Sequence, residues 1–183
     1  MDAQLRNSVV YEMNVRQYTP EGTLNAAAEQ LPRLKDLGVD VVWLMPIHPI
    51  GEKGRKGSLG SYYAIRDYRE INPEFGTMED FQAFLDKAHG LGLKVILDLV
   101  ANHTSPDAAW VTEKPADWYY RDSLGNTIVE YDWTDIAKLN YAKARSTTCR
   151  SSSASSAVPR SFLSCRATRP SSASCPSPES CAA

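Results

Sequence analysis

Residues 94–105 have the sequence KVILDLVANHTS, and this stretch decides the fold. Lys94–Val100 is short and almost continuously apolar, which predicts a strand buried within a parallel sheet. Polar residues follow immediately, among them Asn102 and His103. In open α/β sheets and in α/β barrels alike, ligands bind beyond the carboxyl ends of the strands. We therefore expect a functional site directly after this strand.

Two earlier runs predict strands of the same kind. Val39–Met45 is apolar except for Asp40, and Pro46 ends the run. Residues 9–15 (VVYEMNV) are also short and rich in β-branched residues. His48 follows the second of these strands, as Asn102 and His103 follow the third, so polar side chains gather at the same edge of the predicted sheet.

Helical spacing occupies the stretches between the predicted strands. Apolar residues recur every three or four positions over residues 24–34, and Gly38 follows where a C-terminal stop is expected. Pro32 lies inside this run, so the helix either kinks there or restarts with proline in its first turn. Further along, Thr77 and Asp80 have the spacing of a capping box that opens a second helix.

The order of these elements is strand, helix, strand, long loop, helix, strand. Such alternation predicts an α/β fold in which parallel strands are joined by right-handed helical crossovers. The pattern alone leaves two architectures open, an open doubly wound sheet and a barrel.

Composition divides the chain into two parts. Residues 1–141 carry the strand-like and helix-like runs, whereas residues 142–183 consist mainly of Ser, Ala, Arg, Pro and Cys. The second part predicts a disordered tail, read either out of frame from a GC-rich gene or as a genuine Ser/Pro linker. All four cysteines lie in this tail, where neither a disulfide framework nor a metal site is expected: Cys149, Cys165, Cys175 and Cys181.

Charge and hydropathy restrict the partners. A formal net charge of −2 gives no clustered positive field for nucleic acid or an anionic membrane, so a neutral ligand fits better. Charged residues interrupt residues 1–18, which predicts neither a secretory signal nor a spanning helix and favours a cytoplasmic location.

Two residues of the segment 94–105 are candidates for a chemical role because of their side chains and positions alone. Asp98 is a carboxylate inside an apolar run, which is costly unless it is hydrogen-bonded or paired, so partners are expected. His103 can donate a hydrogen bond to a ligand hydroxyl from the mouth of the strand. A purely structural role remains the alternative for each of them.

Five blocks in a fixed order add a family resemblance. Together they resemble the α-amylase family, glycoside hydrolase family 13: YEMNVRQYTPEGT (11–23), LGVDVVWLMPIHPIG (37–51), SYYAIRDYREINPEFGTMEDF (61–81), GLGLKVILDLVANHTS (90–105) and YDWTDIAKLNY (131–141). The resemblance implies a (β/α)8 TIM barrel. The chain would then contain the first three β/α units and, in residues 104–141, the start of the loop domain after strand 3, an incomplete barrel followed by the tail.

The resemblance also implies roles for four residues. Tyr63 matches the tyrosine that stacks on the sugar where cleavage occurs, and His103 matches the histidine that hydrogen-bonds that sugar. Asp98 matches a carboxylate that orders the active-site network. Asn102 matches a position that ligates Ca²⁺ in many members, and no other cofactor is expected. The implied ligand is an α-glucan or maltooligosaccharide.

The loop segment contains aromatic residues for which two interpretations stay open, packing and a sugar platform, with packing favoured. These residues are Trp110, Trp118, Tyr119, Tyr120 and Trp133.

Catalysis itself is not expected of these 183 residues. Retaining hydrolysis needs a nucleophile and an acid/base carboxyl group, and the family places them on the fourth and fifth barrel strands, whose signatures do not occur here. The resemblance thus predicts an α-glucan-acting retaining glycoside hydrolase by family, represented by an inactive N-terminal portion. The alternative is a non-catalytic fragment that binds oligosaccharide or a partner protein.

Overall fold

The computed structural model describes residues 6–142, and its centre is a three-stranded sheet. The strands β1 (Val10–Met13), β2 (Val41–Leu44) and β3 (Lys94–Leu97) are all parallel and lie in the order β1-β2-β3. Their carboxyl ends are aligned, since Met13 pairs with Leu44 and Leu44 pairs with Leu97. The predicted parallel sheet is therefore confirmed, and the residues that follow its strands meet at one edge.

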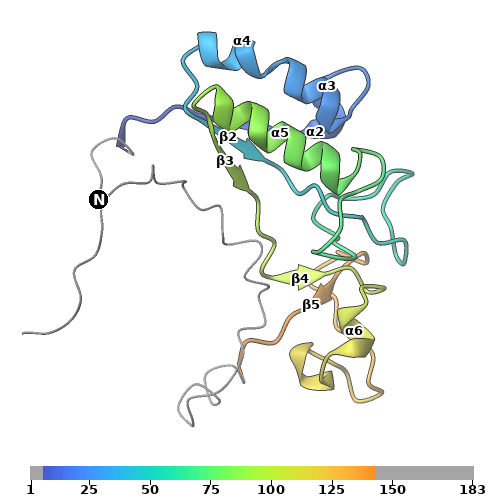
Figure 1. Ribbon diagram of the computed structural model, residues 1–183. Helices are drawn as coiled ribbons and strands as arrows, with labels where there is room; N and C mark the ends of the chain where they lie inside the picture. The colour runs from blue at the N-terminus through green and yellow to red at the C-terminus, as the bar shows by residue number, and fades with distance from the viewer. Residues whose placement is uncertain (1–5, 143–183) are drawn as a thin grey trace, which may run out of the picture.

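Helices pack against one side of this sheet (Figure 1). They are α2 (Val15–Tyr18), α3 (Leu24–Glu29), α4 (Leu31–Asp36) and α5 (Met78–Gly90). Of the two alternatives at Pro32, the restart is confirmed, because α4 begins anew at Leu31 with the proline in its first turn.

The start of α5 is fixed locally, as predicted. The Thr77 hydroxyl accepts from the Asp80 backbone N–H at 3.2 Å, and the Asp80 carboxylate accepts from the Thr77 N–H at 2.8 Å. This reciprocal capping box satisfies two donors that a helix start leaves unpaired.

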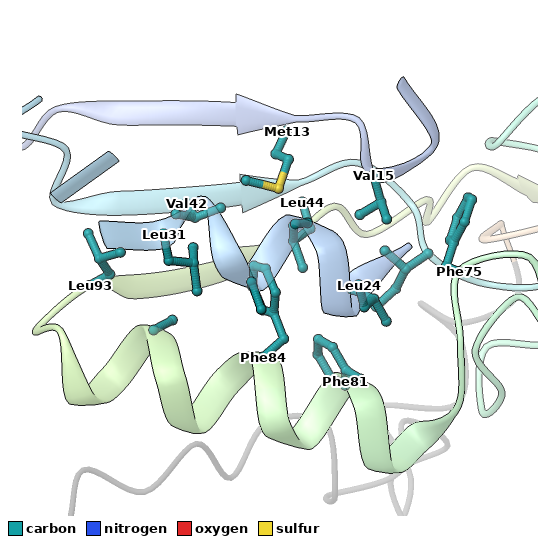
Figure 2. Packing of buried hydrophobic residues seen from close by; sticks show 14 of the residues in the cluster. Met13, Val15, Leu24, Leu31, Val42, Leu44, Phe75, Phe81, Phe84 and Leu93 are labelled. Carbon is teal, nitrogen blue, oxygen red and sulfur yellow. The ribbon is translucent and has the colours of Figure 1, made fainter. Parts of the chain in front are cut away.

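A hydrophobic core fills the space between the helices and the sheet (Figure 2). Phe84 reaches from α5 toward Leu31 of α4 and is fully buried, and Phe81 lies beside Leu24 of α3. Because the stabilisation from apolar burial rises roughly with the buried area, this core holds the strands against the helices and so fixes the carboxyl edge of the sheet.

The strands differ from the prediction in length and, for β1 and β3, in burial, since Val10 of β1 is 52% exposed. β3 ends at Leu97, not Val100, and its residues are alternately half-buried and exposed, with Ile96 49% exposed. The prediction that β3 is buried on both faces is wrong for this chain, because helices of the described residues cover only one face of the sheet. β2, the central strand, is mostly buried as expected.

A smaller unit follows β3. The strands β4 (His103–Thr104) and β5 (Ala137–Lys138) pair antiparallel, with α6 (Trp110–Glu113) and the 3-10 helix η1 (Ala116–Trp118) between them in sequence. The chain runs from the carboxyl end of β3 directly into β4 (Figure 1). This pairing brings the end of the loop segment back to the edge of the sheet.

The predictions for the tail, including its four cysteines, lie outside the described residues, except that Ala142 is described. Within residues 6–142, no helix is both long enough and apolar enough to span a bilayer.

Candidate functional site

Tyr63 and Asp98 meet just beyond the carboxyl end of β3. The Tyr63 hydroxyl donates to Asp98 Oδ2 at 3.1 Å, while the Asp98 backbone N–H donates to the Leu44 carbonyl at 3.0 Å. Asp98 therefore has the partner that its carboxylate was expected to need, although it lies one residue past β3 and is only partly buried. Burial, and next the Asp98 carboxylate, raises the pKa of Tyr63, so the hydroxyl stays protonated and donates at neutral pH.

Backbone hydrogen bonds position the loop that carries Tyr63. The Ser105 N–H donates to the Ile65 carbonyl at 2.8 Å, and the Gly51 N–H donates to the Ala64 carbonyl at 2.9 Å. The first bond ties the loop after β2 to the segment after β3, and the second closes that loop on itself. The Tyr63 side chain nevertheless stays 36% exposed, so one part of its surface is open to a ligand.

His103 lies beside this pair and is 7% exposed. Its Nδ1 lies 3.1 Å from the Asn102 side-chain nitrogen, and its Nε2 is buried without a hydrogen bond to any described residue. Burial lowers the pKa of His103, and the Tyr63 backbone carbonyl opposes the shift, so the ring is neutral at pH 7. A neutral imidazole with one unused nitrogen suits hydrogen bonding to an uncharged ligand.

Tyr68 fastens the segment between β3 and β4. Its hydroxyl contacts the Val100 carbonyl at 2.5 Å and the His103 carbonyl at 3.0 Å. Burial raises the pKa of Tyr68. Tyr68 lies in the family block 61–81, five positions after Tyr63, and no local sequence pattern indicates this role.

His48 contacts Glu70 and Tyr68 in the loop that carries Tyr63. It is buried, its Nδ1 lies 2.9 Å from the Glu70 carbonyl, and burial lowers its pKa. Its ring also packs 5.6 Å from that of Tyr68. His48 thus supports the loop behind the site.

Two residues that sequence reasoning missed surround Asn102. The Asn102 side-chain nitrogen donates to Glu130 Oε2 at 3.2 Å, and Lys138 Nζ donates to Glu130 Oε1 at 2.5 Å. Lys138, and next Asn102, lowers the pKa of Glu130, while Glu130 raises that of Lys138. Glu130 lies 28 residues after Asn102, and no spacing rule could have linked them.

Calcium does not fit this arrangement. The ion takes about six to eight oxygen ligands, but Asn102 directs its nitrogen, not its oxygen, at the Glu130 carboxylate. The Lys138 ammonium already neutralises that carboxylate. Among residues 6–142, no cluster of three His, Cys, Asp or Glu side chains is placed to hold a metal ion.

Three aromatic residues of the loop segment serve packing. Trp110 stacks on Tyr68 with ring centroids 5.0 Å apart, and Trp118 meets Trp110 edge-on at 6.1 Å. Tyr119 is 2% exposed, and its hydroxyl lies 3.0 Å from Thr104 Oγ1. For Tyr119 the packing interpretation is confirmed, and the ring contacts of Trp110 and Trp118 favour it.

Trp133 and Tyr120 are different, because both remain substantially exposed. The Trp133 ring is 39% exposed and lies 6.0 Å from that of His103. Trp133 and Tyr63 are thus two exposed aromatic residues that interact with His103. Aromatic faces, neutral hydrogen-bonding groups and one carboxylate form a site that suits an uncharged polyhydroxyl ligand.

Comparison with known proteins identifies the family. The profile described as "Alpha amylase, catalytic domain" matches residues 4–146. The chain belongs to the alpha-amylase catalytic-domain family. The resemblance carried by the five blocks is therefore confirmed. An oligo-1,6-glucosidase from Heyndrickxia coagulans is 39% identical over 126 residues, which cover 64% of this chain and 21% of that protein. Alpha-amylase 3 from Dictyoglomus thermophilum is 37% identical over 125 residues, covering 64% and 23%.

Solved structures agree on the fold. An alpha-amylase from Lactobacillus plantarum superposes with a TM-score of 0.75 at 49% identity, covering 81% of this chain and 35% of that one. This chain thus has the fold of the N-terminal part of a TIM barrel, and its parallel sheet is part of that barrel. The chain spans about a fifth of the length of the first curated relatives that it matches.

Proposed function

We propose that this chain forms part of the substrate-binding wall of an α-glucan-acting, retaining glycoside hydrolase. One observation carries the proposal: the four residues expected from the family blocks lie in two hydrogen-bonded pairs, Tyr63 with Asp98 and Asn102 with His103, at the carboxyl edge of the sheet. The Tyr63 backbone also opposes the effect of burial on the pKa of His103.

Each residue has a role in this proposal. The Tyr63 ring stacks on the C–H face of a glucosyl unit, and the Asp98 carboxylate holds its hydroxyl. His103 hydrogen-bonds a sugar hydroxyl through its buried Nε2. Asn102 orients the His103 ring and is not a calcium ligand in this chain.

We assign the barrel part to residues 1–141, as the first three β/α units and the start of the loop domain. The two carboxyl groups of retaining hydrolysis are not among the family blocks in these residues. The 183-residue polypeptide by itself is then inactive, and its site binds sugar without cleaving it. A maltooligosaccharide is the ligand class that this surface suits, and cytoplasmic carbohydrate metabolism is the proposed setting.

A chimera tests the proposed wall. Residues 1–141 are joined to the remaining barrel of the Lactobacillus plantarum alpha-amylase, and the turnover number is measured on a chromogenic maltoside. If the His103 contact strengthens in the transition state, His103→Ala lowers kcat by about thirty- to a thousandfold, or roughly 2 to 4 kcal/mol.

The exposed Lys53, which belongs to none of the five family blocks, supplies the control variant Lys53→Ala. The control should retain the kcat of the parent chimera. An active chimera whose kcat is the same with and without His103 would refute the proposed role.

A further inference from the structure

A continuous chain of hydrogen bonds leads from Lys138 to His103. Lys138 Nζ lies 2.5 Å from Glu130 Oε1, and Asn102 Nδ2 lies 3.2 Å from Glu130 Oε2 and 3.1 Å from His103 Nδ1. The pairing of β4 with β5 sets His103 opposite Lys138, so the backbone register fixes the two residues at which this series of hydrogen bonds begins and ends. Glu130 and Lys138 are 23% and 33% exposed at their side chains, so water competes only partly for these bonds.

The donor and acceptor roles along the chain are determined by charge. Glu130 is ionised beside the Lys138 ammonium and can only accept. The amide of Asn102 must therefore present its NH₂ to Glu130, since the opposite orientation would set its carbonyl oxygen against a carboxylate. The same NH₂ faces His103 Nδ1.

This orientation has a consequence for the imidazole ring. A nitrogen that accepts from an amide N–H carries no proton, so Nδ1 is bare and the single proton of the neutral ring sits on Nε2. Nε2 has no hydrogen bond that meets distance and angle requirements with a described residue, and the Tyr63 backbone is the further group that acts on this ring.

We propose that Glu130, held by Lys138, is a positioning residue that fixes the Nε2–H tautomer of His103 through the Asn102 amide. His103 then offers the ligand a donor, and the sugar oxygen that meets it must accept. Without Glu130 the amide is free to turn, and Asn102 Oδ1 then accepts from a proton on Nδ1. The sugar as ligand rests on the proposed function, whereas the tautomer does not.

The full 183-residue chain, with ¹⁵N-labelled histidine, tests this directly. The chain has three histidines, and His103→Gln assigns the signals of interest. Long-range ¹H–¹⁵N correlation at pH 8, above the usual His pKa of about 6.5, distinguishes the bare from the protonated ring nitrogen. We expect the wild-type chain to show His103 mainly as Nε2–H.

Variants then separate Glu130 from general structure. Glu130→Ala should move the tautomer ratio about fivefold toward Nδ1–H, as loss of one net hydrogen bond implies. Glu130→Gln should move it less, and Lys138→Arg should preserve it. The matched control is Glu29→Ala, which breaks the 2.7 Å ion pair between Glu29 and Lys87 and should leave His103 unchanged.

Two results would overturn the proposal: a wild-type chain with mainly Nδ1–H, or an unchanged ratio in Glu130→Ala with the His48 signals in their native positions. If Glu130→Ala does not fold, Glu130→Gln and the wild-type tautomer decide. Titration with maltoheptaose distinguishes the two proposals. A tautomer that depends on Glu130, in a chain whose signals do not respond to the sugar, would support the positioning role and count against the proposed function.

Discussion

Replacing Tyr63 by Phe and by Ala separates the hydroxyl of this residue from its ring. Tyr63→Phe removes one hydrogen bond, the 3.1 Å contact with Asp98 Oδ2, and leaves the aromatic face in place. A hydrogen bond to a charged group contributes about 1.5 to 3 kcal/mol when it is well shielded. Tyr63 is 36% exposed, so water offsets part of this, and we take about 1 kcal/mol, or about fivefold in rate.

Tyr63→Ala also removes the ring that stacks on the sugar. The expected loss is roughly 2 to 4 kcal/mol in the transition state, or about thirty- to a thousandfold in kcat. The assay is steady-state hydrolysis of a chromogenic maltoside by the chimera of residues 1–141 with the remaining barrel of the Lactobacillus plantarum enzyme. Both kcat and KM are needed, because only interactions that strengthen in the transition state lower kcat.

A matched control exists at Tyr18, whose hydroxyl accepts a hydrogen bond from Arg33 at 2.8 Å. Tyr18→Phe loses a comparable bond to a charged partner away from the proposed site and should keep the parent kcat. Equal losses in Tyr63→Phe and Tyr63→Ala would show that the ring does not stack on substrate. No loss in either variant would refute the role of Tyr63.

Three further predictions concern the 183-residue chain. Thr77→Ala should lower the free energy of unfolding in urea by about 1 kcal/mol, as loss of a helix N-cap does, whereas Ser123→Ala at an exposed position should change it little. The hydrogen bond that the Asp80 carboxylate accepts from the Thr77 backbone N–H lowers the pKa of Asp80. The stability that this carboxylate contributes is therefore present above the ordinary Asp pKa of about 4 and is lost as the pH falls through the pKa of the folded state. The urea midpoint of Asp80→Asn should thus fall less than that of the wild type between pH 5 and pH 2. Calcium or a chelator should leave the urea midpoint unchanged, because Lys138 already neutralises the carboxylate beside Asn102, and a midpoint that rises with calcium would contradict this.

Sequence pattern predicted features that depend on neighbours along the chain. The capping box at Thr77 and Asp80 needs only residues three positions apart, and the restart at Pro32 is one of the two outcomes that the missing N–H of proline allows. The parallel order followed from the alternation of strands and helices. The family blocks then named Tyr63, which no local rule would have paired with Asp98 across 35 residues.

Features that depend on distant contacts were not predictable. An apolar run such as Lys94–Val100 does not reveal where its strand ends or what covers it. The predicted length of β3 and the predicted burial of Ile96 were therefore wrong. Glu130 contacts Asn102, and Lys138 contacts Glu130, only because β5 pairs with β4, and that pairing joins residues 33 and 35 positions apart. The orientation of the Asn102 amide, which argues against calcium, depends on those contacts.

The most direct measurement of the central claim compares two proteins on one chromogenic maltoside. We expect the chimera of residues 1–141 with the remaining barrel of the Lactobacillus plantarum alpha-amylase to turn the substrate over, because the chain supplies the binding wall and the remainder supplies the two carboxyl groups. The purified 183-residue polypeptide should show no turnover above a vector control. A folded chimera without activity, or hydrolysis by the 183-residue polypeptide alone, would contradict the account.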